Sequence, residues 1–169
     1  MATVAPVTPV TCERTFLRHT LATLAYRGSK AVRGAPPEFA SFKASPTSRT
    51  PLEILEHIGD LMVWALSLAK ENHSYEQATP LPWDEQVRRF HASMAALDAF
   101  LASDGPLVMN CEKLFQGPIA DAISHVGQLN MLRRVFGAPV KGENYTKATI
   151  AAGRVGADQE PPDPKYEFD

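Results

Sequence analysis

Three side chains that can bind a metal ion lie in two segments with helical periodicity. Asp121 and His125 are four residues apart, and residues at this spacing lie one above the other on a helix. His57 interrupts the apolar stripe of an earlier segment. Two imidazoles and one carboxylate can bind a divalent cation and leave a position open for water or substrate. The sequence therefore indicates a candidate metal site formed by His57, Asp121 and His125.

The same residues permit a second interpretation. Asp121 and His125 share a helix face with Leu129 and other apolar residues, so this face is expected to point into the core. Burying a polar group without a partner costs on the order of 2–7 kcal/mol, and burying a charge costs more. A hydrogen-bonded network of Asp121 with His57 and His125 would compensate that cost, as a metal ion would. Spacing alone leaves both interpretations open.

Four helices are predicted from the spacing of apolar residues. Positions three, four and seven apart recur in four stretches, whereas the alternation typical of strands is scarce. We predict helices over about residues 11–32, 51–70, 84–103 and 117–136.

Local signals mark several helix ends. The residues 50–53, Thr-Pro-Leu-Glu, match an N-cap, a proline in the first turn and the glutamate of a capping box. Asp84 is the expected N-cap of the third helix, and Gly117-Pro118 is expected to open the fourth. Gly137 predicts the end of that helix.

The predicted elements describe a single all-α domain over residues 1–169, a four-helix bundle with long crossover connections and a C-terminal arm. The bundle is expected over about residues 11–137. The connection over about residues 33–49 is long, so we expect it to cross the bundle rather than form a tight hairpin. Residues 138–169 are rich in Gly, Pro and charge, and we expect an ordered arm with a frayed end.

Composition disfavours several classes of protein. The 169 residues suit one domain, and the net charge of −2 provides no polybasic surface for a nucleic acid. No apolar run is long enough to span a bilayer, and the N-terminus lacks the pattern of a signal peptide. We therefore expect a cytoplasmic protein in which Cys12 and Cys111 are reduced thiols.

The two segments with the candidate ligands resemble helices of the DinB-like four-helix-bundle metalloproteins. Residues 50–68, TPLEILEHIGDLMVWALSL, resemble the second helix of that family, with its metal-binding histidine at His57. Residues 121–134, DAISHVGQLNMLRR, resemble the last helix. There the family pattern has a histidine, three residues, His-Arg-Gly-Gln and a later Leu-Arg pair. Residues 125–128, His-Val-Gly-Gln, and the pair Leu132-Arg133 match its later part.

One ligand position departs from the family pattern. The resemblance transfers the ligand role to His57 and His125, but the third histidine of the family falls on Asp121. It therefore implies a site of two histidines and one carboxylate, which suits zinc or nickel, and also manganese or iron. Gln128 is expected either to support a ligand from behind or to bond to a neighbouring helix.

The resemblance also implies an activity. Family members include metal-dependent transferases that join a small cytoplasmic thiol to an electrophile, and thiol-dependent isomerases. The leading hypothesis is a transferase that uses a low-molecular-weight thiol on a small electrophilic substrate, in a homodimer. Three alternatives stay open: a metal-dependent hydrolase, an iron oxygenase, and a non-enzymatic dimeric bundle with a structural metal or a buried His/Asp network.

Four further residues bear on the site. His91 follows Phe90 near the apolar stripe of the third helix and is a candidate to reach the site. Trp64 is expected either to wall a pocket or to lie in the core. Tyr145 would line the site if the arm folded over the mouth of the bundle. Cys111 has an acidic neighbour and is expected to be a poor nucleophile.

Overall fold

Long helices make up most of the computed structural model, which describes residues 12–70 and 74–169. The expected all-α class is confirmed at this level, with one minor two-stranded sheet. The long helices are α1 (Cys12–Val32), α2 (Pro51–Lys70), α3 (Trp83–Ala102) and α5 (Ala120–Phe136). Thr11, the expected first residue of α1, lies outside the described residues. Within the described ranges, no helix is both long and apolar enough to cross a membrane.

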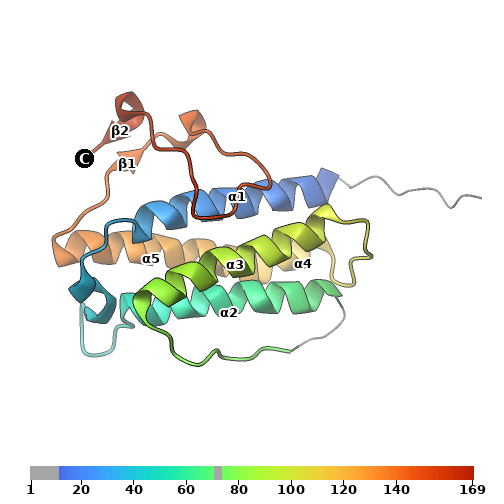
Figure 1. Cartoon of the computed structure of the whole chain (residues 1–169), viewed down its shortest axis with the longest axis horizontal. Helices are drawn as coiled ribbons and strands as arrows, with labels where there is room; N and C mark the ends of the chain where they lie inside the picture. Colours follow the sequence, from blue (N-terminus) through green and yellow to red (C-terminus); the bar gives the residue numbers. More distant parts are fainter. Residues whose placement is uncertain (1–11, 71–73) are drawn as a thin grey trace, which may run out of the picture.

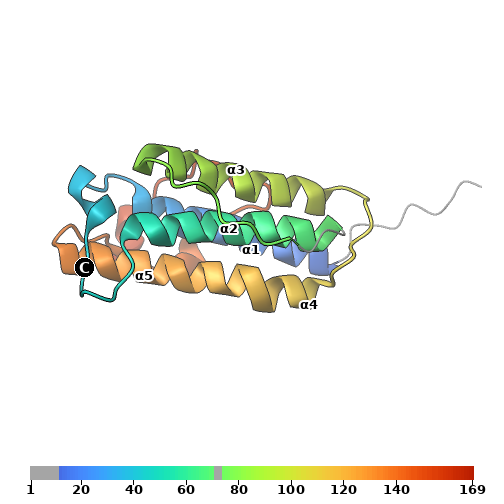
Figure 2. The same ribbon diagram turned by 90° about the horizontal axis from the view of Figure 1, so that it is seen from below.

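The four long helices lie side by side along one direction (Figures 1 and 2). α2 packs against α3 and α5, and α1 packs against the other sides of the same two helices. The connection between α1 and α2 therefore leads to a helix that is not a main packing neighbour of α1. This explains why a long segment, which includes a 3₁₀ turn at Pro37–Ser41, is needed there.

The core between the helices consists of leucine, isoleucine, methionine and alanine side chains. The predicted stripe of α1 is buried, with Leu17, Leu21 and Leu24 at most 1% exposed. Burial of such side chains is the main stabilising contribution to a fold of this kind. The remaining helices supply the other large side chains of the core: Leu55, Ile58, Met62, Phe90, Met94, Leu97, Leu101 and Leu114.

The predicted start of α2 is confirmed in detail. The amide of Thr50 donates to Glu53 Oε2 at 2.7 Å, and the amide of Glu53 donates to Thr50 Oγ1 at 3.2 Å. These are the two reciprocal bonds of a capping box. The expected N-cap role of Asp84 is wrong, because α3 begins at Trp83 and Pro82 occupies the N-cap position, two residues earlier.

The last helix does not begin at Gly117-Pro118 as predicted. A short helix, α4 (Cys111–Leu114), begins earlier, and its N-cap Asn110 accepts a hydrogen bond from the amide of Lys113 at 2.9 Å. A π-helical segment, Phe115–Ile119, then joins α4 to α5, with Gly117 at ψ −105°. Pro118 has no amide hydrogen, so the chain bends there instead of starting a new helix. As predicted, α5 ends at Gly137, which has a φ of 91°.

The C-terminal arm is ordered, as expected, and lies on the α1 side of the molecule (Figure 1). Glu143 accepts hydrogen bonds from Tyr26 Oη at 2.8 Å and Lys30 Nζ at 2.9 Å, and Lys30 also pairs with Glu167 at 2.8 Å. The expectation of a frayed end is wrong, because these contacts and a strand pair hold the end of the arm in place. The paired antiparallel strands are β1 (Gly142–Glu143) and β2 (Glu167–Phe168).

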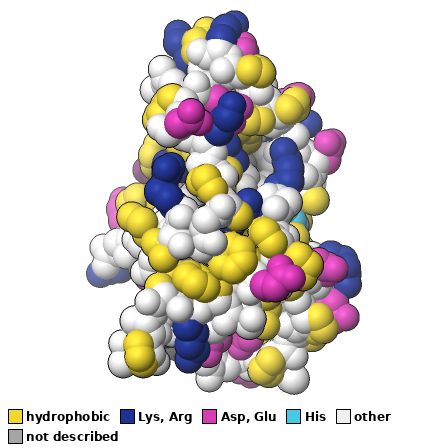
Figure 3. Space-filling model, turned by 90° about the vertical axis from the view of Figure 1, so that its left-hand side faces the viewer, with side chains coloured by type: hydrophobic (Ala, Val, Ile, Leu, Met, Phe, Trp, Pro, Cys, Tyr) yellow, Lys and Arg dark blue, Asp and Glu magenta, His cyan; other side chains and the backbone are white. Residues whose placement is uncertain are grey.

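An aromatic cluster holds the α1–α2 connection against the ends of two helices. Phe39 packs edge-on against Trp83 of α3 and Phe136 of α5, and Phe42 also packs against Phe136. Figure 3 looks onto this end of the molecule, where hydrophobic side chains lie among interspersed basic and acidic ones. The cluster thereby sets the path of residues 42–50 toward the start of α2.

Candidate metal centre

α2 and α5 bring the three candidate ligands together. His57 Nε2 lies 3.4 Å from Asp121 Oδ2, and His125 Nε2 lies 3.4 Å from Asp121 Oδ1. The two imidazole rings are nearly perpendicular, at 88°, with centroids 4.8 Å apart. One ligand atom from each residue lies within 4.8 Å of the other two. The three residues therefore form a group that could hold a metal ion.

The distances in this group suit a small divalent cation. Zinc binds histidine nitrogen and carboxylate oxygen at about 2.0–2.2 Å, so neighbouring ligand atoms in a tetrahedral site are about 3.3–3.5 Å apart. The two nitrogen-to-oxygen distances of 3.4 Å, from His57 to Oδ2 and from His125 to Oδ1 of Asp121, fall in that range, and the three ligand atoms together lie within 4.8 Å of one another. Three protein ligands fill three tetrahedral positions, and the fourth is available to a water or a substrate.

The group lies at the edge of the core rather than within it. The side chains of His57, His125 and Asp121 are 21%, 11% and 49% exposed, respectively. The expectation that Asp121 is buried is therefore wrong. Apolar periodicity identified one face of α5, but the first turn of that face lies at the surface. Because solvent reaches the carboxylate, its burial needs no compensation, and that argument for a buried polar network is lost.

Gln128 contacts His125 at the ring nitrogen that is not the one near Asp121, which is one of its two expected roles. Gln128 Oε1 lies 2.8 Å from His125 Nδ1 and accepts its hydrogen. In neutral His125 the other nitrogen, Nε2, then presents a lone pair to Asp121 Oδ1 at 3.4 Å. Two acceptors facing each other repel, and a cation between them removes the repulsion. The arrangement of His125 is therefore compatible with a bound cation, while His57 can also donate a hydrogen bond to Asp121.

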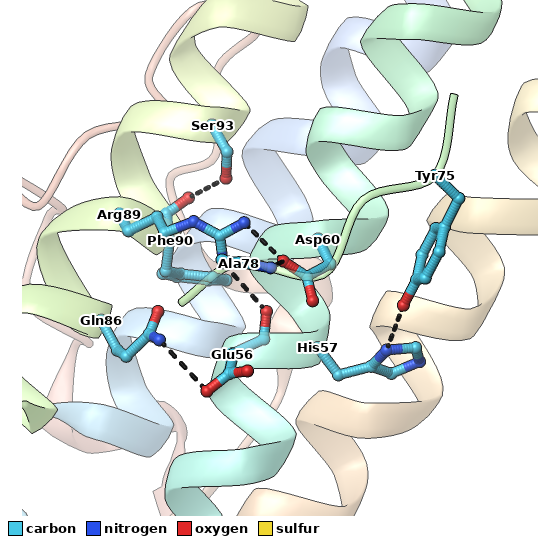
Figure 4. Close-up of polar contacts among 9 residues, drawn as sticks. All are labelled: Glu56, His57, Asp60, Tyr75, Ala78, Gln86, Arg89, Phe90 and Ser93. Atoms are coloured by element: carbon cyan, nitrogen blue, oxygen red, sulfur yellow. Dashed lines mark hydrogen bonds and ion pairs between the residues drawn. The ribbon is translucent and has the colours of Figure 1, made fainter. Parts of the chain in front are cut away.

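Tyr75 supports His57 in a similar way. Its Oη lies 3.3 Å from His57 Nδ1 (Figure 4), whereas the other ring nitrogen, Nε2, is the one that lies near Asp121. Metal-binding histidines usually bond through their second nitrogen to a polar group, which fixes the ring orientation. Sequence reasoning missed Tyr75, because it belongs to the connection between α2 and α3, where no periodic pattern places a side chain.

One stripe of α2 holds that connection in place. Asp60, Trp64 and Ser67 follow His57 at helical spacing and lie under residues 74–78. Ser67 Oγ donates to the carbonyl of Ser74 at 3.1 Å, and the Trp64 ring packs edge-on against Tyr75 at 5.8 Å. Trp64 is half-buried, so it supports Tyr75 rather than lining the metal group formed by His57, Asp121 and His125.

Asp60 is the anchor of the stripe. It is 2% exposed, and its Oδ1 accepts hydrogen bonds from Arg89 Nη2 at 2.5 Å and the amide of Ala78 at 3.3 Å (Figure 4). Arg89 also donates to the carbonyl of Glu56 at 3.1 Å. This buried ion pair ties α3 and the connection to α2, one turn from His57.

The electrostatics of the group keep His57 neutral. Burial lowers the pKa of His57 first, and the nearby His125 and Arg49 lower it further. Asp121 acts in the opposite direction but does not outweigh them. A neutral imidazole is the form that binds a metal ion.

A pocket of about 620 Å³ opens beside the metal group. Ligand pockets of proteins commonly have volumes of about 300–1,000 Å³. Its walls combine the three candidate ligands with apolar and polar side chains from α2, α5 and the end of the α1–α2 connection. The residues that line it are Ser48, Arg49, Ile54, His57, Asp121, His125, Gln128, Met131 and Leu132.

Three other sequence candidates do not reach the site. His91 is buried at the far side of α3, where its Nδ1 lies 3.2 Å from the Val155 carbonyl. Tyr145 packs edge-on against Tyr26 on α1. Cys111 is a free thiol whose pKa is raised, first by burial and then by nearby carboxylates, which fits the expected poor nucleophile. The side chain of Cys12 lies outside the described part.

Comparison with known proteins gives no match: no protein-family model, curated protein or solved structure is significantly similar to the chain.

Proposed function

We propose that this chain is a DinB-like four-helix-bundle metalloprotein, and that it is a metal-dependent transferase joining a low-molecular-weight thiol to a small electrophile. One observation supports the proposal above the others. The Nε2 atoms of His57 and His125 both face Asp121, while Tyr75 and Gln128 hold the opposite nitrogens. Ligands oriented in this way, beside a pocket, are typical of catalytic rather than structural metal sites.

The donor set bears on the identity of the ion. Two imidazole nitrogens and one carboxylate oxygen suit zinc and nickel, and also bind manganese and iron. We propose zinc or nickel, because nitrogen donors outnumber oxygen donors in His57, Asp121 and His125. When bound, the ion would supply a site for the cosubstrate's thiol and stabilise it as a thiolate near neutral pH.

The protein's own residues divide the remaining tasks. Tyr75 and Gln128 keep the two imidazoles in the orientation that points Nε2 toward Asp121. Ile54 and Leu132 are 3% and 9% exposed and give the pocket an apolar wall. Such a wall provides apolar surface for the body of a small electrophile beside the metal group.

The pocket also bears on the hydrolase alternative. A metal-dependent hydrolase needs a general base beside the attacking water. Among the described residues that line the pocket, Asp121 is the one carboxylate, and the proposed ion would occupy it. This lining favours the transferase. We further propose a homodimer and a cytoplasmic location, on the basis of the family resemblance alone.

The proposal is tested by a conjugation assay. Protein loaded with zinc or nickel is incubated with 1-chloro-2,4-dinitrobenzene and, in turn, glutathione, cysteine and coenzyme A, and conjugates are measured by mass spectrometry. We expect one thiol to be conjugated at a rate above that of the His57→Ala variant. The His19→Ala variant is the control, because His19 is exposed on α1. Rates equal to that of His57→Ala with every thiol and both ions would overturn the transferase proposal.

A further inference from the structure

Arg49 is the one basic side chain among the described residues that line the metal pocket. It directly precedes Thr50, the N-cap of α2, so the capping box holds its backbone at the mouth of the pocket. The position of this cation therefore belongs to the site.

The guanidinium of Arg49 is exposed, and within residues 12–70 and 74–169 it makes no hydrogen bond or ion pair. Glu53, the carboxylate on which the charge of Arg49 acts, accepts two hydrogen bonds from Thr50 and none from Arg49. The five donors of Arg49 are consequently free to bind a planar anion.

The two sides of Arg49 differ in charge. On one side lies the metal pocket, where Asp121 is the one acidic side chain among the described lining residues and would be neutralised by a cation. On the other side lies a second cavity of about 460 Å³, which shares Arg49 and His57 with the metal pocket and is also lined by Glu53 and Glu56. These two carboxylates make the second cavity less favourable for an anion than the metal pocket.

The other residues that line the pocket determine which shape of ligand fits it. Ile54, Met131 and Leu132 contribute apolar surface beside the metal group. A molecule that fills this space has a short apolar body, a donor atom for the ion and an anionic group for Arg49. Carboxylates match this requirement, because a guanidinium binds them with two parallel hydrogen bonds.

We propose that the small molecule bound at the metal group carries a carboxylate, and that Arg49 binds it. This inference rests on the proposed metal-dependent function and names the chemical class of its substrate. Arg49 discriminates between substrates by charge, so that neutral molecules of the same size bind more weakly.

Paired thiols test the proposal on protein loaded with Co²⁺. 3-Mercaptopropionate carries a carboxylate and 2-mercaptoethanol does not, and thiolate binding to Co²⁺ is followed by its near-ultraviolet absorption. We expect wild-type protein to bind the acid about tenfold more tightly, the effect of one charge-assisted hydrogen-bonded pair. Arg49→Gln is expected to remove this preference while the affinity for 2-mercaptoethanol stays unchanged.

The matched control is Lys43→Gln, which removes one positive charge from the same connection at a residue that does not line the pocket. We expect it to keep the preference for the acid. An equal preference in wild type and Arg49→Gln would overturn the proposal, and so would an equal loss in Lys43→Gln and Arg49→Gln.

A second measurement separates this inference from the metal proposal. Metal content is determined on the same samples, and modification of Arg49 by phenylglyoxal is followed in metal-free protein with and without succinate. We expect succinate to slow modification at Arg49 and not at Arg134, an exposed residue outside the pocket. Absence of bound cobalt with protection of Arg49 would contradict the metal site alone, whereas equal modification of both arginines would contradict the anion site.

Discussion

Gln128 follows His125 by one helical turn on α5, and its Oε1 lies 2.8 Å from His125 Nδ1. This contact leaves Nε2 of the neutral ring as an acceptor that faces a carboxylate oxygen. The orientation is unfavourable without a positive charge between the two atoms and favourable with one. If the proposed ion is bound, Gln128, although exposed, is expected to influence metal affinity through His125.

Replacing Gln128 is expected to weaken metal binding. The Gln128→Ala variant loses the acceptor that orients His125, and loss of such a partner typically lowers metal affinity 10–100-fold. Affinity is measured by competition with a chromogenic chelator. Ser124→Ala on the same helix is the control, since Ser124 Oγ donates only to the Ala120 carbonyl, at 3.0 Å. Equal affinities of Gln128→Ala and wild type would show that Gln128 does not orient the ligand.

Tyr75→Phe isolates a single hydroxyl. The variant keeps the edge-on contact with Trp64 and loses the hydrogen bond to His57 Nδ1. We expect metal affinity to fall by about tenfold, with little change in thermal stability because Tyr75 is 45% exposed. The same chelator competition and a thermal melt check both statements. A large fall in the melting temperature with unchanged affinity would assign Tyr75 a structural role instead.

Substitution of Asp60 and substitution of Asp121 are expected to have opposite effects on stability and metal binding. Asp60 is buried and paired with Arg89, so Asp60→Ala is expected to lower the free energy of unfolding by about 3–5 kcal/mol. Asp121 is half-exposed, so Asp121→Ala is expected to abolish metal binding and change the stability of metal-free protein by less than about 1 kcal/mol. Urea unfolding with and without metal measures both. Strong destabilisation of metal-free Asp121→Ala would instead support a structural polar network.

We expect the stability of the protein to depend on pH because of His91. Burial lowers the pKa of His91, and Arg33 adds to this, while the Val155 carbonyl opposes it. The unfolded chain takes up a proton near pH 6.5, but the folded protein keeps His91 neutral to lower pH. The free energy of unfolding of metal-free protein is therefore expected to fall as the pH drops below about 6.5.

Two variants assign that pH dependence. His91→Gln is expected to reduce it, and His19→Gln is expected to leave it unchanged, because His19 is exposed. Urea unfolding at several pH values between 5 and 7.5 is the measurement. His57 contributes in the same direction, so the reduction in His91→Gln is partial. An identical slope in His91→Gln and wild type would contradict the assignment.

Local signals in the sequence predicted the parts of the fold that depend on neighbouring residues. The capping box of Thr50 and Glu53 and the glycine at position 137 set helix ends through contacts a few residues long. The start of the last helix was predicted wrongly, because Gly117-Pro118 also fits a bend inside a helix. Sequence does not distinguish these two uses of proline unless the preceding turn is recognised as helical.

The candidate site shows a second limit of prediction from the sequence. Helical spacing predicted that Asp121 and His125 share a face, but it did not show that the start of this face is open to solvent. Tyr75 and Arg49 lie in connections, where position depends on tertiary contacts such as those of Asp60 and of the aromatic cluster. Residues of this kind carry no periodic signal, and the structure is needed to bring them to the site.

Metal content tests the central claim most directly. Wild-type protein and the variants His57→Ala, Asp121→Ala and His19→Ala are loaded with zinc, nickel, manganese and iron in turn, desalted and measured by mass spectrometry. We expect about one ion per chain in wild type and His19→Ala, and almost none in His57→Ala and Asp121→Ala. Absence of every ion from the wild type, or its retention in both ligand variants, would contradict a metal site at His57, Asp121 and His125.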